Sequence, residues 1–338
     1  MKIDDEPVSI SVVVPVYSGE EYLEQLVFQL NSLRNQWIDQ RAPMNLMELI
    51  LVDDSARDGS PKIVDRLAEL HDWIVPLHLS RNYGQHPATI AGILYSSGNW
   101  VVTMDEDLQH PPQKISALLA TAVGSASDVI YAQPIDKVHR NSYRDLASRK
   151  IKWLVGWLTG SEHVRLINSF RLIRGEIARS VSSVAIHDTY FDIEIGFFTQ
   201  RIVGLPMELV DERFAKTGKS GYSFRSLVSH AWRMIFSSNL RVLRFMAVIG
   251  GGTVCLSFFI AVTLIISNLI WPDAVSVRGW ASQMVATVFF GGINIAMIGI
   301  VLQYLSTLVL RAHGRPTFFV IDRSTDSRLA NYFIKTST

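Results

Sequence analysis

The stretch Thr103-Met104-Asp105-Glu106-Asp107-Leu108-Gln109-His110-Pro111-Pro112 decides how the rest of this chain is arranged. The apolar run at residues 100–104 predicts a buried β-strand, which ends at three consecutive carboxylates. The proline pair then prevents the strand from continuing and leads into a helix. Because ligands bind at the carboxyl ends of strands in open α/β sheets, the three acids lie where chemistry is expected.

The spacing of Asp105 and Asp107 suits a divalent metal ion. The two residues are two positions apart, so a turning backbone can direct both carboxylates at one hard cation. Mg²⁺ is commonly bound by one or two carboxylates and completes its shell with phosphate oxygens of the substrate. An Asp-x-Asp pair also occurs in solvated acidic turns, so the choice between metal site and turn depends on the rest of the chain.

Predicted strands and helices alternate on both sides of this stretch. Runs of β-branched and other apolar residues predict strands at 9–17, 46–52, 74–79 and 128–132. Helical patterns occur at 20–35, 60–71, 87–97 and 142–158, with one more helix after the proline pair. Weaker signals predict strands at 168–173 and 206–210 and helical parts between 181 and 203. This order predicts the α/β class, with a mostly parallel sheet covered by helices on both faces.

Length and charge narrow the function classes. The chain has 338 residues, enough for one large domain or two medium ones, and its net charge of +1 gives no field that favours nucleic acid. The single cysteine, Cys255, excludes an intramolecular disulfide. The first residues, MKIDDEPVS, are acidic and lack an apolar core, so we expect no cleavable signal peptide.

The C-terminal third predicts a membrane anchor. Residues 224–244 interleave arginines with large apolar side chains, as in a helix lying in the membrane interface. Two uncharged runs follow, 245–271 and 281–310, and the first would be about 40 Å long as a helix, enough to cross a bilayer. Arginines outside both runs predict that both ends lie in the cytoplasm. We therefore expect a cytoplasmic domain (1–223), an amphipathic helix, two spans and a cytoplasmic tail (311–338), although two buried core helices are the alternative.

Polar groups follow four of the predicted strands. In a parallel sheet these groups converge on one edge, where carboxylates can accept hydrogen bonds from a nucleotide base and ribose. No G-x-G-x-x-G follows the first strand, which argues against a dinucleotide oxidoreductase. Thr217-Gly218-Lys219-Ser220 imitates the end of a P-loop, but Arg213 stands where the first glycine is needed.

Four motifs, PVYSGEE (15–21), LVDDSARDGS (51–60), SRNYGQHPATIAG (80–92) and MDEDLQHPP (104–112), resemble the motif series of glycosyltransferase family 2. The resemblance is to its polyprenyl-phosphate glycosyltransferases, which include dolichyl-phosphate mannose synthases, undecaprenyl-phosphate glucosyltransferases and the aminoarabinose transferase of lipid A modification. It covers nearly the whole chain, because these proteins also end in two membrane helices and an Arg-Pro tail, here Gly314-Arg315-Pro316. It implies a Rossmann-like GT-A fold, a Mg²⁺ or Mn²⁺ cofactor and inversion at the anomeric carbon.

The resemblance also implies roles for individual residues. Asp54, together with Asp53, would hold the nucleotide base, and Asp105 would bind ribose and metal. Asp107 is the preferred direct metal ligand, and Gln109 matches a family position near the metal. The remaining residues expected in the nucleotide-sugar site are Pro15, Val16, Tyr17, Glu20, Arg81, Gln85, His86 and Glu106. A purely structural role for His86 stays open.

The acceptor side departs from the family pattern. Several bacterial relatives have an Asp, proposed as the base, before Phe-Arg-Leu, where this chain has Ser169. A strong base is not required, because a phosphate monoester has a second pKa near 6 and is largely dianionic at neutral pH. Positioning groups are then expected, with Ser169 and Arg171 at the reaction centre and Arg213, Lys216, Lys219 and Ser220 on the lipid phosphate. Alternatively, Arg171 pairs with the metal-site acids. A smaller departure is Tyr17-Ser18-Gly19-Glu20 in place of Tyr-Asn-Glu.

The expected function is transfer of a sugar from a nucleotide diphosphate sugar, with UDP favoured, to a polyprenyl phosphate such as undecaprenyl phosphate. The expected location is the inner membrane of a bacterium, with a homotetramer as the expected assembly. A processive polysaccharide synthase would need more membrane helices and a Gln-x-x-Arg-Trp motif that the sequence lacks. A non-catalytic membrane scaffold and a transferase to another lipid acceptor stay open, and the sequence does not specify the sugar.

Overall fold

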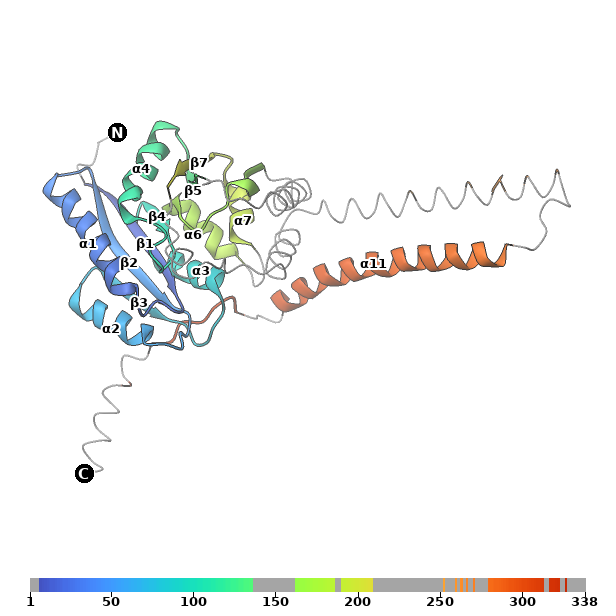
Figure 1. Ribbon diagram of the computed structural model, residues 1–338, viewed down its shortest axis with the longest axis horizontal. Helices are drawn as coiled ribbons and strands as arrows, with labels where there is room; N and C mark the ends of the chain where they lie inside the picture. Colours follow the sequence, from blue (N-terminus) through green and yellow to red (C-terminus); the bar gives the residue numbers. More distant parts are fainter. Residues whose placement is uncertain are drawn as a thin grey trace, which may run out of the picture.

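The computed structural model describes residues 6–135, 162–185, 190–208, 279–312 and 316–322, with isolated positions between 252 and 270 and at 326. These residues form an α/β domain, from which the long helix α11 (Trp280–Ala312) extends (Figure 1). The predicted helix at 142–158, the amphipathic segment at 224–244 and nearly all of the first predicted span lie outside the described residues.

The centre of the domain is a seven-stranded sheet with the order β3-β2-β1-β4-β6-β5-β7. Strands β1, β2 and β4 follow the apolar runs of the sequence, and neighbouring strands among β3, β2, β1 and β4 are parallel. Strand β6 is antiparallel to both of its neighbours, whereas β5 and β7 are parallel to each other. The strands are β1 Val8–Val16, β2 Met44–Asp53, β3 Ile74–His78, β4 Trp100–Thr103, β5 Val129–Pro134, β6 Arg171–Arg174 and β7 Ile202–Met207.

The reversed direction of β6 makes the sheet mixed, and it matters for the site. Thr103, the last residue of β4, pairs with Arg171, the first residue of β6. In an antiparallel pair, the start of one strand lies beside the end of the other. The residues just before β6, Ser169 and Phe170, are therefore placed at the carboxyl end of β4, where the acidic stretch begins.

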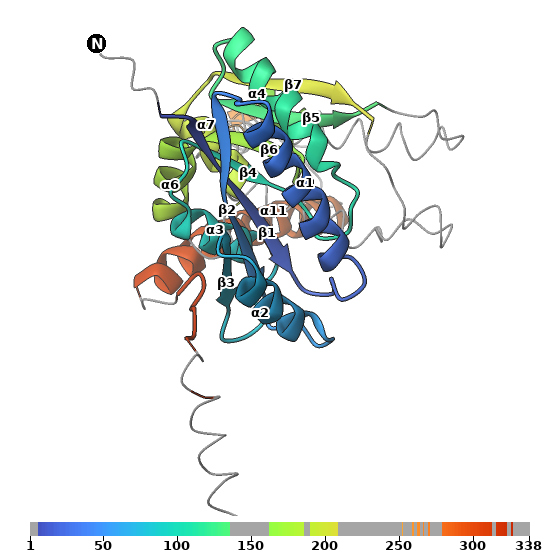
Figure 2. The same ribbon diagram turned by 90° about the vertical axis from the view of Figure 1, so that its left-hand side faces the viewer.

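Helices cover both faces of the sheet (Figure 2). Alternate residues of β1 point to opposite faces, so Val12 and Val14 belong to one buried cluster and Val13 to the other. The first cluster includes buried residues of α1 (Leu23–Asp39), α2 (Ser60–Leu70) and α4 (Ile115–Gly124). The second includes residues of α3 (Gln85–Tyr95), α6 (Gly175–Val184) and α7 (Phe191–Phe198). Two short 3₁₀ helices are η1 (Pro112–Lys114) and η2 (Glu162–Arg165).

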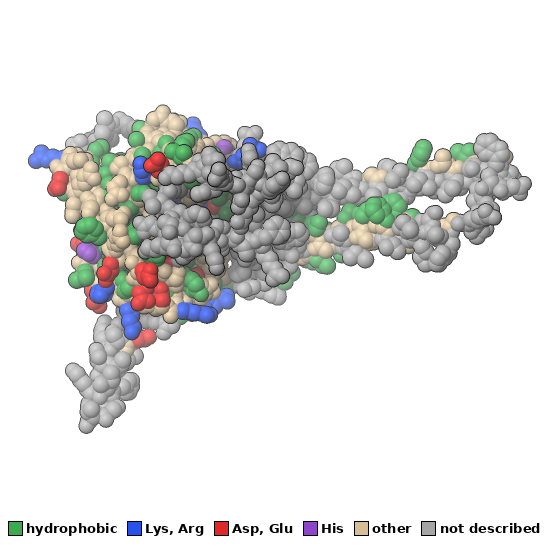
Figure 3. Space-filling view, viewed as in Figure 1, with side chains coloured by type: hydrophobic (Ala, Val, Ile, Leu, Met, Phe, Trp, Pro, Cys, Tyr) green, Lys and Arg blue, Asp and Glu red, His purple; other side chains and the backbone are tan. Residues whose placement is uncertain are grey.

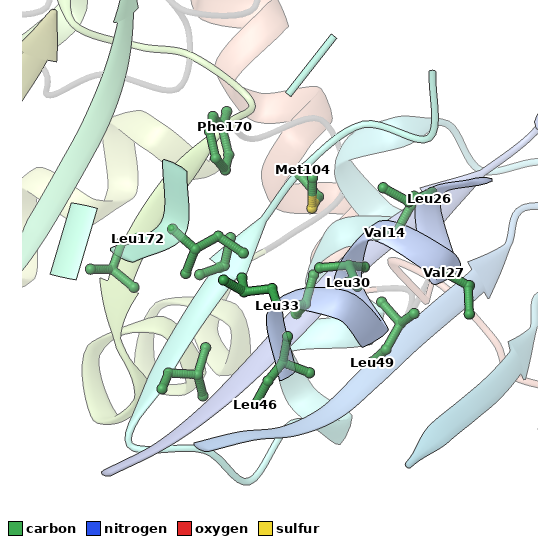
Figure 4. Close-up of a cluster of buried hydrophobic side chains, with 14 of the residues drawn as sticks. Val14, Leu26, Val27, Leu30, Leu33, Leu46, Leu49, Met104, Phe170 and Leu172 are labelled. Carbon is green, nitrogen blue, oxygen red and sulfur yellow. The ribbon is translucent and has the colours of Figure 1, made fainter. Parts of the chain in front are cut away.

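The larger cluster connects the N-terminal helix to the strand that carries the acids. Leu26, Leu30 and Leu33 of α1 are fully or almost fully buried, and they lie close to Met104 (Figure 4). Each such side chain contributes about 1.5–3 kcal/mol when it is removed from water. This packing fixes the end of β4 and, with it, the position of Asp105.

The last strand, β7, covers Ile202–Met207, whereas the sequence predicted a strand at 206–210. Gly204 and Pro206 lie inside it, and both weaken a strand signal in a sequence. In the described sheet β7 pairs only with β5, at the edge. An edge strand tolerates proline because one side of its backbone needs no ladder hydrogen bond.

Helix α11 covers the second uncharged run. Its described side chains include several large, exposed apolar ones (Figure 3), among them Phe289, Ile298, Leu302, Leu305 and Leu308. Among the described residues, no helix has both the length and the hydropathy required to cross a membrane. The two membrane spans therefore stay predictions.

Candidate active site

Asp105 is the centre of a hydrogen-bonded cluster at the carboxyl end of β4. Gln85, at the start of α3, donates from Nε2 to Asp105 Oδ1 at 2.5 Å. Ser169, just before β6, donates from Oγ to Asp105 Oδ2 at 2.7 Å. The Ser169 backbone is itself held, since its carbonyl accepts a bond of 2.7 Å from Thr103 Oγ1. Three predicted site residues, which come from separate parts of the sequence, are thus brought together.

His110 supports the same cluster, and the sequence interpretation assigned it no role. Its Nδ1 accepts a hydrogen bond of 3.0 Å from the Asp105 backbone N–H, and its ring stacks on Phe170 with centroids 5.0 Å apart. Burial lowers the pKa of His110, although Asp105 and Asp107 act in the opposite direction. A neutral ring with Nδ1 as acceptor carries its proton on Nε2, which lies 4.0 Å from Asp105 Oδ2.

A tight turn orients Asp107. Gln109 donates to the Asp107 carboxylate from its side chain at 3.0 Å and from its backbone N–H at 3.4 Å. Between them, Leu108 has a φ of 61° and is buried. A bulky residue in the left-handed region is uncommon, and such strain concentrates at ligand sites. The structure therefore places Gln109 in contact with Asp107, as a hydrogen-bond donor to its carboxylate.

Glu106 and Glu20 bind neighbouring loops. The Glu106 carboxylate accepts hydrogen bonds from the backbone N–H groups of Tyr17 at 2.9 Å and Ser18 at 3.0 Å. A Cβ at Gly19 would lie only 2.6 Å from Glu106 Oε2, so a larger residue at this position would displace the carboxylate. Burial raises the pKa of Glu106. Glu20 similarly accepts a bond of 2.8 Å from Gly59 N–H. We expected both glutamates in the nucleotide-sugar site. In the structure, their carboxylates accept hydrogen bonds that connect the loops of the site.

The two aspartates at the end of β2, Asp53 and Asp54, are buried and hydrogen-bonded. Asp54 accepts bonds from the N–H groups of Tyr83 at 2.7 Å and Gly84 at 2.8 Å. Burial raises the pKa of Asp54, while these two N–H groups lower it. Asp53 contacts His78 Nδ1 at 2.9 Å and accepts a bond of 2.8 Å from Ala56 N–H. Both predicted base-binding residues thus lie at the expected edge of the sheet and organise its loops.

The donor loop, residues 80–84, connects β3 to α3 and carries the next predicted residues. Arg81 is exposed, and its guanidinium lies 4.4 Å from the centre of the Tyr83 ring. Ser80 Oγ is 3.0 Å from the Tyr83 hydroxyl. Beyond the loop, the His86 ring lies 4.6 Å from that of Tyr190. At the end of β1, Pro15 is half-buried, Val16 is buried and Tyr17 is exposed.

The acceptor side contains a buried ion pair. Arg171 of β6 bonds to Asp192 of α7, and Asp192 also accepts a hydrogen bond of 2.7 Å from the Tyr131 hydroxyl. Burial lowers the pKa of Arg171, but Asp192, together with Tyr131 and Tyr190, raises it by more, so the guanidinium stays charged. Arg171 was expected to meet the lipid phosphate or the metal-site acids, and the structure pairs it with Asp192. Arg213, Lys216, Lys219 and Ser220 lie outside the described residues.

The oxygen donors of this edge suit a metal that is completed by substrate. The described residues contain no group of three or more His, Cys, Asp or Glu side chains placed to hold a metal ion. Asp105 and Asp107 are both half-buried and already oriented by Gln85, Ser169 and Gln109. Mg²⁺ is usually bound by one or two carboxylates, with the remaining ligands from water and phosphate. These residues therefore fit a divalent cation of that kind.

Comparisons with known proteins agree with this fold. The model of the family "Glycosyl transferase family 2" matches residues 11–185. Undecaprenyl-phosphate 4-deoxy-4-formamido-L-arabinose transferase of Proteus mirabilis is 30% identical over 317 residues, which are 92% of this chain and 92% of that protein. The protein of the same name from Photorhabdus laumondii is 28% identical, over 92% of this chain and 93% of its own length.

A solved structure with a similar fold is glucosyl-3-phosphoglycerate synthase from Mycobacterium tuberculosis, in complex with Mn²⁺, UDP and phosphoglyceric acid. It has a TM-score of 0.48 and 15% identity, and the match covers 68% of this chain and 77% of that one. The family model alone covers just over half of the chain and all of the strand ends described above, apart from β7. The chain therefore belongs to glycosyl transferase family 2, and it is a glycosyltransferase.

Proposed function

We propose that this enzyme transfers a sugar from a nucleotide diphosphate sugar, UDP-linked in the first instance, to undecaprenyl phosphate at the cytoplasmic face of a bacterial inner membrane. The observation that carries the proposal is the Asp105 cluster, in which Gln85 and Ser169 fix a carboxylate at the carboxyl end of β4. The acceptor is inferred from the names of relatives that match along 92% of the chain.

The donor would lie across the carboxyl ends of β1, β2 and β4. The Arg81 guanidinium over Tyr83 offers a flat, charged surface beside the expected base site. Asp105 is oriented by two side-chain hydrogen bonds before any ligand arrives, so little ordering is required when ribose or metal binds. The half-buried Asp107 stands next to it, with Gln109 bonded to its carboxylate.

A divalent cation, Mg²⁺ or Mn²⁺, would be held by Asp105 and Asp107, with Gln109 behind them. When bound, such a cation neutralises negative charge on the diphosphate as it leaves. The protein's own part is to hold the two carboxylates in place. Ser169 donates a hydrogen bond to Asp105 Oδ2, so its proposed role is that of a positioning residue and not of a base.

The proposed reaction is a single displacement with inversion. An oxygen of the lipid phosphate forms a bond to the anomeric carbon while the bond from that carbon to the donor's diphosphate oxygen breaks. The products are polyprenyl-monophosphoryl-sugar and the nucleoside diphosphate. Since the acceptor phosphate has its second pKa near 6, no strong base is needed, and alignment with charge compensation supplies the catalysis. Arg213, Lys216, Lys219 and Ser220 remain the proposed groups for the lipid phosphate.

The lipid acceptor requires access to a membrane. The exposed apolar side chains of α11 and the uncharged runs at 245–271 and 281–310 support a two-helix anchor. The basic, aromatic segment at 224–244 would lie at the interface and bring the phosphate head group toward the acids. A homotetramer is the proposed assembly, with Gly250-Gly251-Gly252 and Gly291-Gly292 permitting close helix packing.

The test is transfer to undecaprenyl phosphate from a panel of radiolabelled UDP- and GDP-sugars, including UDP-4-deoxy-4-formamido-L-arabinose. Each donor is assayed with Mg²⁺, with Mn²⁺ and with EDTA. We expect a labelled lipid from one donor, absent with EDTA and reduced about 10²–10³-fold by Asp107→Ala. Asp39→Ala, a change of the same type at the exposed end of α1, serves as the control and should transfer normally.

Two results would contradict the proposal. Product that survives both EDTA and Asp107→Ala would remove the metal and the assigned carboxylate from the mechanism. No product from any donor, together with no metal-dependent binding of nucleotide, would favour the non-catalytic membrane scaffold. Transfer to other lipid phosphates but not to undecaprenyl phosphate would retain the enzyme and change its acceptor.

A further inference from the structure

The segment that follows α11 returns to the sheet. Residues 316–322, called the tail segment here, run antiparallel to the end of β3, where Leu79 and Val320 form an isolated bridge. Two backbone hydrogen bonds flank this bridge, one of 2.9 Å from Ser80 N–H to the Phe319 carbonyl and one of 2.9 Å from Ile321 N–H to the His78 carbonyl. The tail segment thus extends the sheet order beyond β3, next to which it is seen in both ribbon views (Figures 1 and 2).

Side chains also fix the tail segment to the domain. Phe318 and Val320 pack against the buried cluster that contains Leu79 and Ile90, and Tyr83 packs against the same cluster. On the other side, Thr317 Oγ1 donates a hydrogen bond of 3.3 Å to the carbonyl of Ala185, just after α6. The tail segment therefore extends from the end of β3 to the end of helix α6.

The contact with Ser80 links the tail segment to the donor loop. Ser80 is the first residue of this loop, and its hydroxyl is 3.0 Å from that of Tyr83. At the other end of the loop, the N–H groups of Tyr83 and Gly84 donate to Asp54. Gly84 has a φ of 98°, which fixes the exit of the loop in a conformation that only glycine adopts easily. The tail segment therefore binds the first residue of the donor loop, and Asp54 binds its last two residues.

We propose that the tail segment is a positioning element of the donor site: by pairing with Leu79 and Ser80, it holds Arg81 and Tyr83 in the conformation that binds the nucleotide. This inference rests on the proposed function, since it concerns the nucleotide of the proposed donor. Arg81 and Asn82 are exposed, so their conformation depends on the two fixed ends of the loop. When the tail segment is undocked, the first residue of the donor loop is no longer held. The affinity for the nucleotide then falls in proportion to the fraction of molecules in which the loop remains ordered.

The first test removes one backbone donor. Ile321→Pro abolishes the N–H that bonds the His78 carbonyl. Ile321→Ala is the matched control, because it shortens the same side chain but keeps the N–H that donates to the His78 carbonyl. In titrations of the full chain with UDP and Mn²⁺, we expect the Kd to rise about tenfold for Ile321→Pro, as it does when only a tenth of the loops stay ordered. The Kd should change less than about twofold for Ile321→Ala, which keeps the backbone hydrogen bond.

The second test locks the tail segment in place. Cα atoms of a non-hydrogen-bonded antiparallel pair lie about 4.5 Å apart, within the range of a disulfide. Leu79→Cys with Val320→Cys, in a Cys255→Ala background, should therefore form a disulfide within one chain. We expect the oxidised protein to bind UDP with Mn²⁺ at least as tightly as the reduced form of the same protein. Because the oxidised and reduced forms are the same protein, the comparison does not depend on two variants folding equally well.

The outcomes separate this inference from the proposed function. A wild-type chain that binds neither UDP nor GDP with metal would overturn the proposed function and, with it, a donor role for the tail segment. Wild-type binding that Ile321→Pro leaves unchanged would overturn the tail proposal alone. Tighter binding by the reduced protein than by the oxidised one would make the docked segment inhibitory, and a disulfide-linked dimer on a denaturing gel would place the docking between chains. Either result would overturn the proposal as stated.

Discussion

The two halves of the sheet use charged residues in different ways. In the donor half, made of β3, β2, β1 and β4, carboxylates after the strands accept hydrogen bonds from loop backbones, as Asp54 does from Tyr83 and Gly84. In the acceptor half, made of β6, β5 and β7, Arg171 and Asp192 form a buried ion pair. Carboxylates in the donor half thus organise loops for a ligand, whereas Arg171 is part of the core.

This difference shows why a charged residue beside an active site need not bind substrate. Arg171 lies two residues after Ser169 in the sequence and opposite Thr103 in the sheet, yet its side chain is buried and bonded to α7. A buried charge without its partner is strongly unfavourable. Replacing Arg171 should therefore change stability first, whereas replacing carboxylates of the donor half should change ligand binding.

The largest expected effect is on the acceptor half. Arg171→Met leaves Asp192 buried without its counter-charge, so we expect the free energy of unfolding to fall by about 3–5 kcal/mol in urea denaturation. The double variant Arg171→Met with Asp192→Leu should lose less, because no unpaired charge remains. If Arg171→Met unfolds like the wild type and instead raises KM for the lipid, the two halves do not differ in the way described.

A smaller loss of stability is expected from Glu106→Gln. The Glu106 carboxylate accepts from the N–H groups of Tyr17 and Ser18, and a glutamine NH₂ would face one of them, donor against donor. We expect a loss of about 1–3 kcal/mol, measured in the same way. Glu24→Gln in the exposed ion pair with Arg66 is the control and should lose at most about 1 kcal/mol. Equal losses for both variants would show that Glu106 does not hold the loop of β1.

Ser169 offers a sharper test at the boundary of the two halves. Ser169→Ala removes one hydrogen bond to Asp105, worth about 0.5–1.5 kcal/mol, so kcat/KM should fall by about tenfold or less. Ser169→Asp places a second carboxylate against Asp105 and should lower activity further by repulsion. A loss of more than about a hundredfold for Ser169→Ala would show that its hydroxyl acts on the reactants.

The smallest effect is a pH dependence of the donor half. Hydrogen bonding to Asp53, with a further contribution from Asp65, raises the pKa of His78 above its ordinary value of 6.5, although burial acts in the opposite direction. A raised pKa on folding stabilises the fold fully below pH 6.5, and this stabilisation is lost as the pH rises through the folded pKa. Thermal unfolding from pH 5.5 to 8.5 should show the wild type losing stability relative to His78→Asn. Parallel curves would contradict the assignment.

Local sequence patterns were sufficient to predict the donor half of the sheet. The apolar run that became β1 and the acids after β2 and β4 are encoded within a few residues, and the motifs fix their order. Parallel strands then bring their carboxyl ends to one edge, so Gln85 and Asp105 meet as the sequence predicted. This part of the site follows from periodicity and topology alone.

The acceptor half could not be predicted in the same way, because its contacts depend on strand direction. Nothing in Arg171-Leu172-Ile173-Arg174 states that β6 runs antiparallel to β4, yet that direction decides that Ser169 reaches Asp105. The partner of Arg171 comes from a helix 21 residues later, in a stretch whose helical pattern was weak. The run Tyr190 to Phe198 contains two carboxylates, Asp192 and Glu194, among apolar residues, and nothing in the sequence shows which of them meets Arg171.

The docked tail segment also affects how the protein is made. Leu79 leaves the ribosome early, and its partner Val320 is more than 200 residues later. At about 5–20 residues per second, the end of β3 waits on the order of ten seconds to a minute for its neighbour. An unpaired strand edge is a template for pairing with other chains. The nascent enzyme is therefore most prone to aggregate while its C-terminal third is being synthesised, until the tail segment covers the edge beside β3.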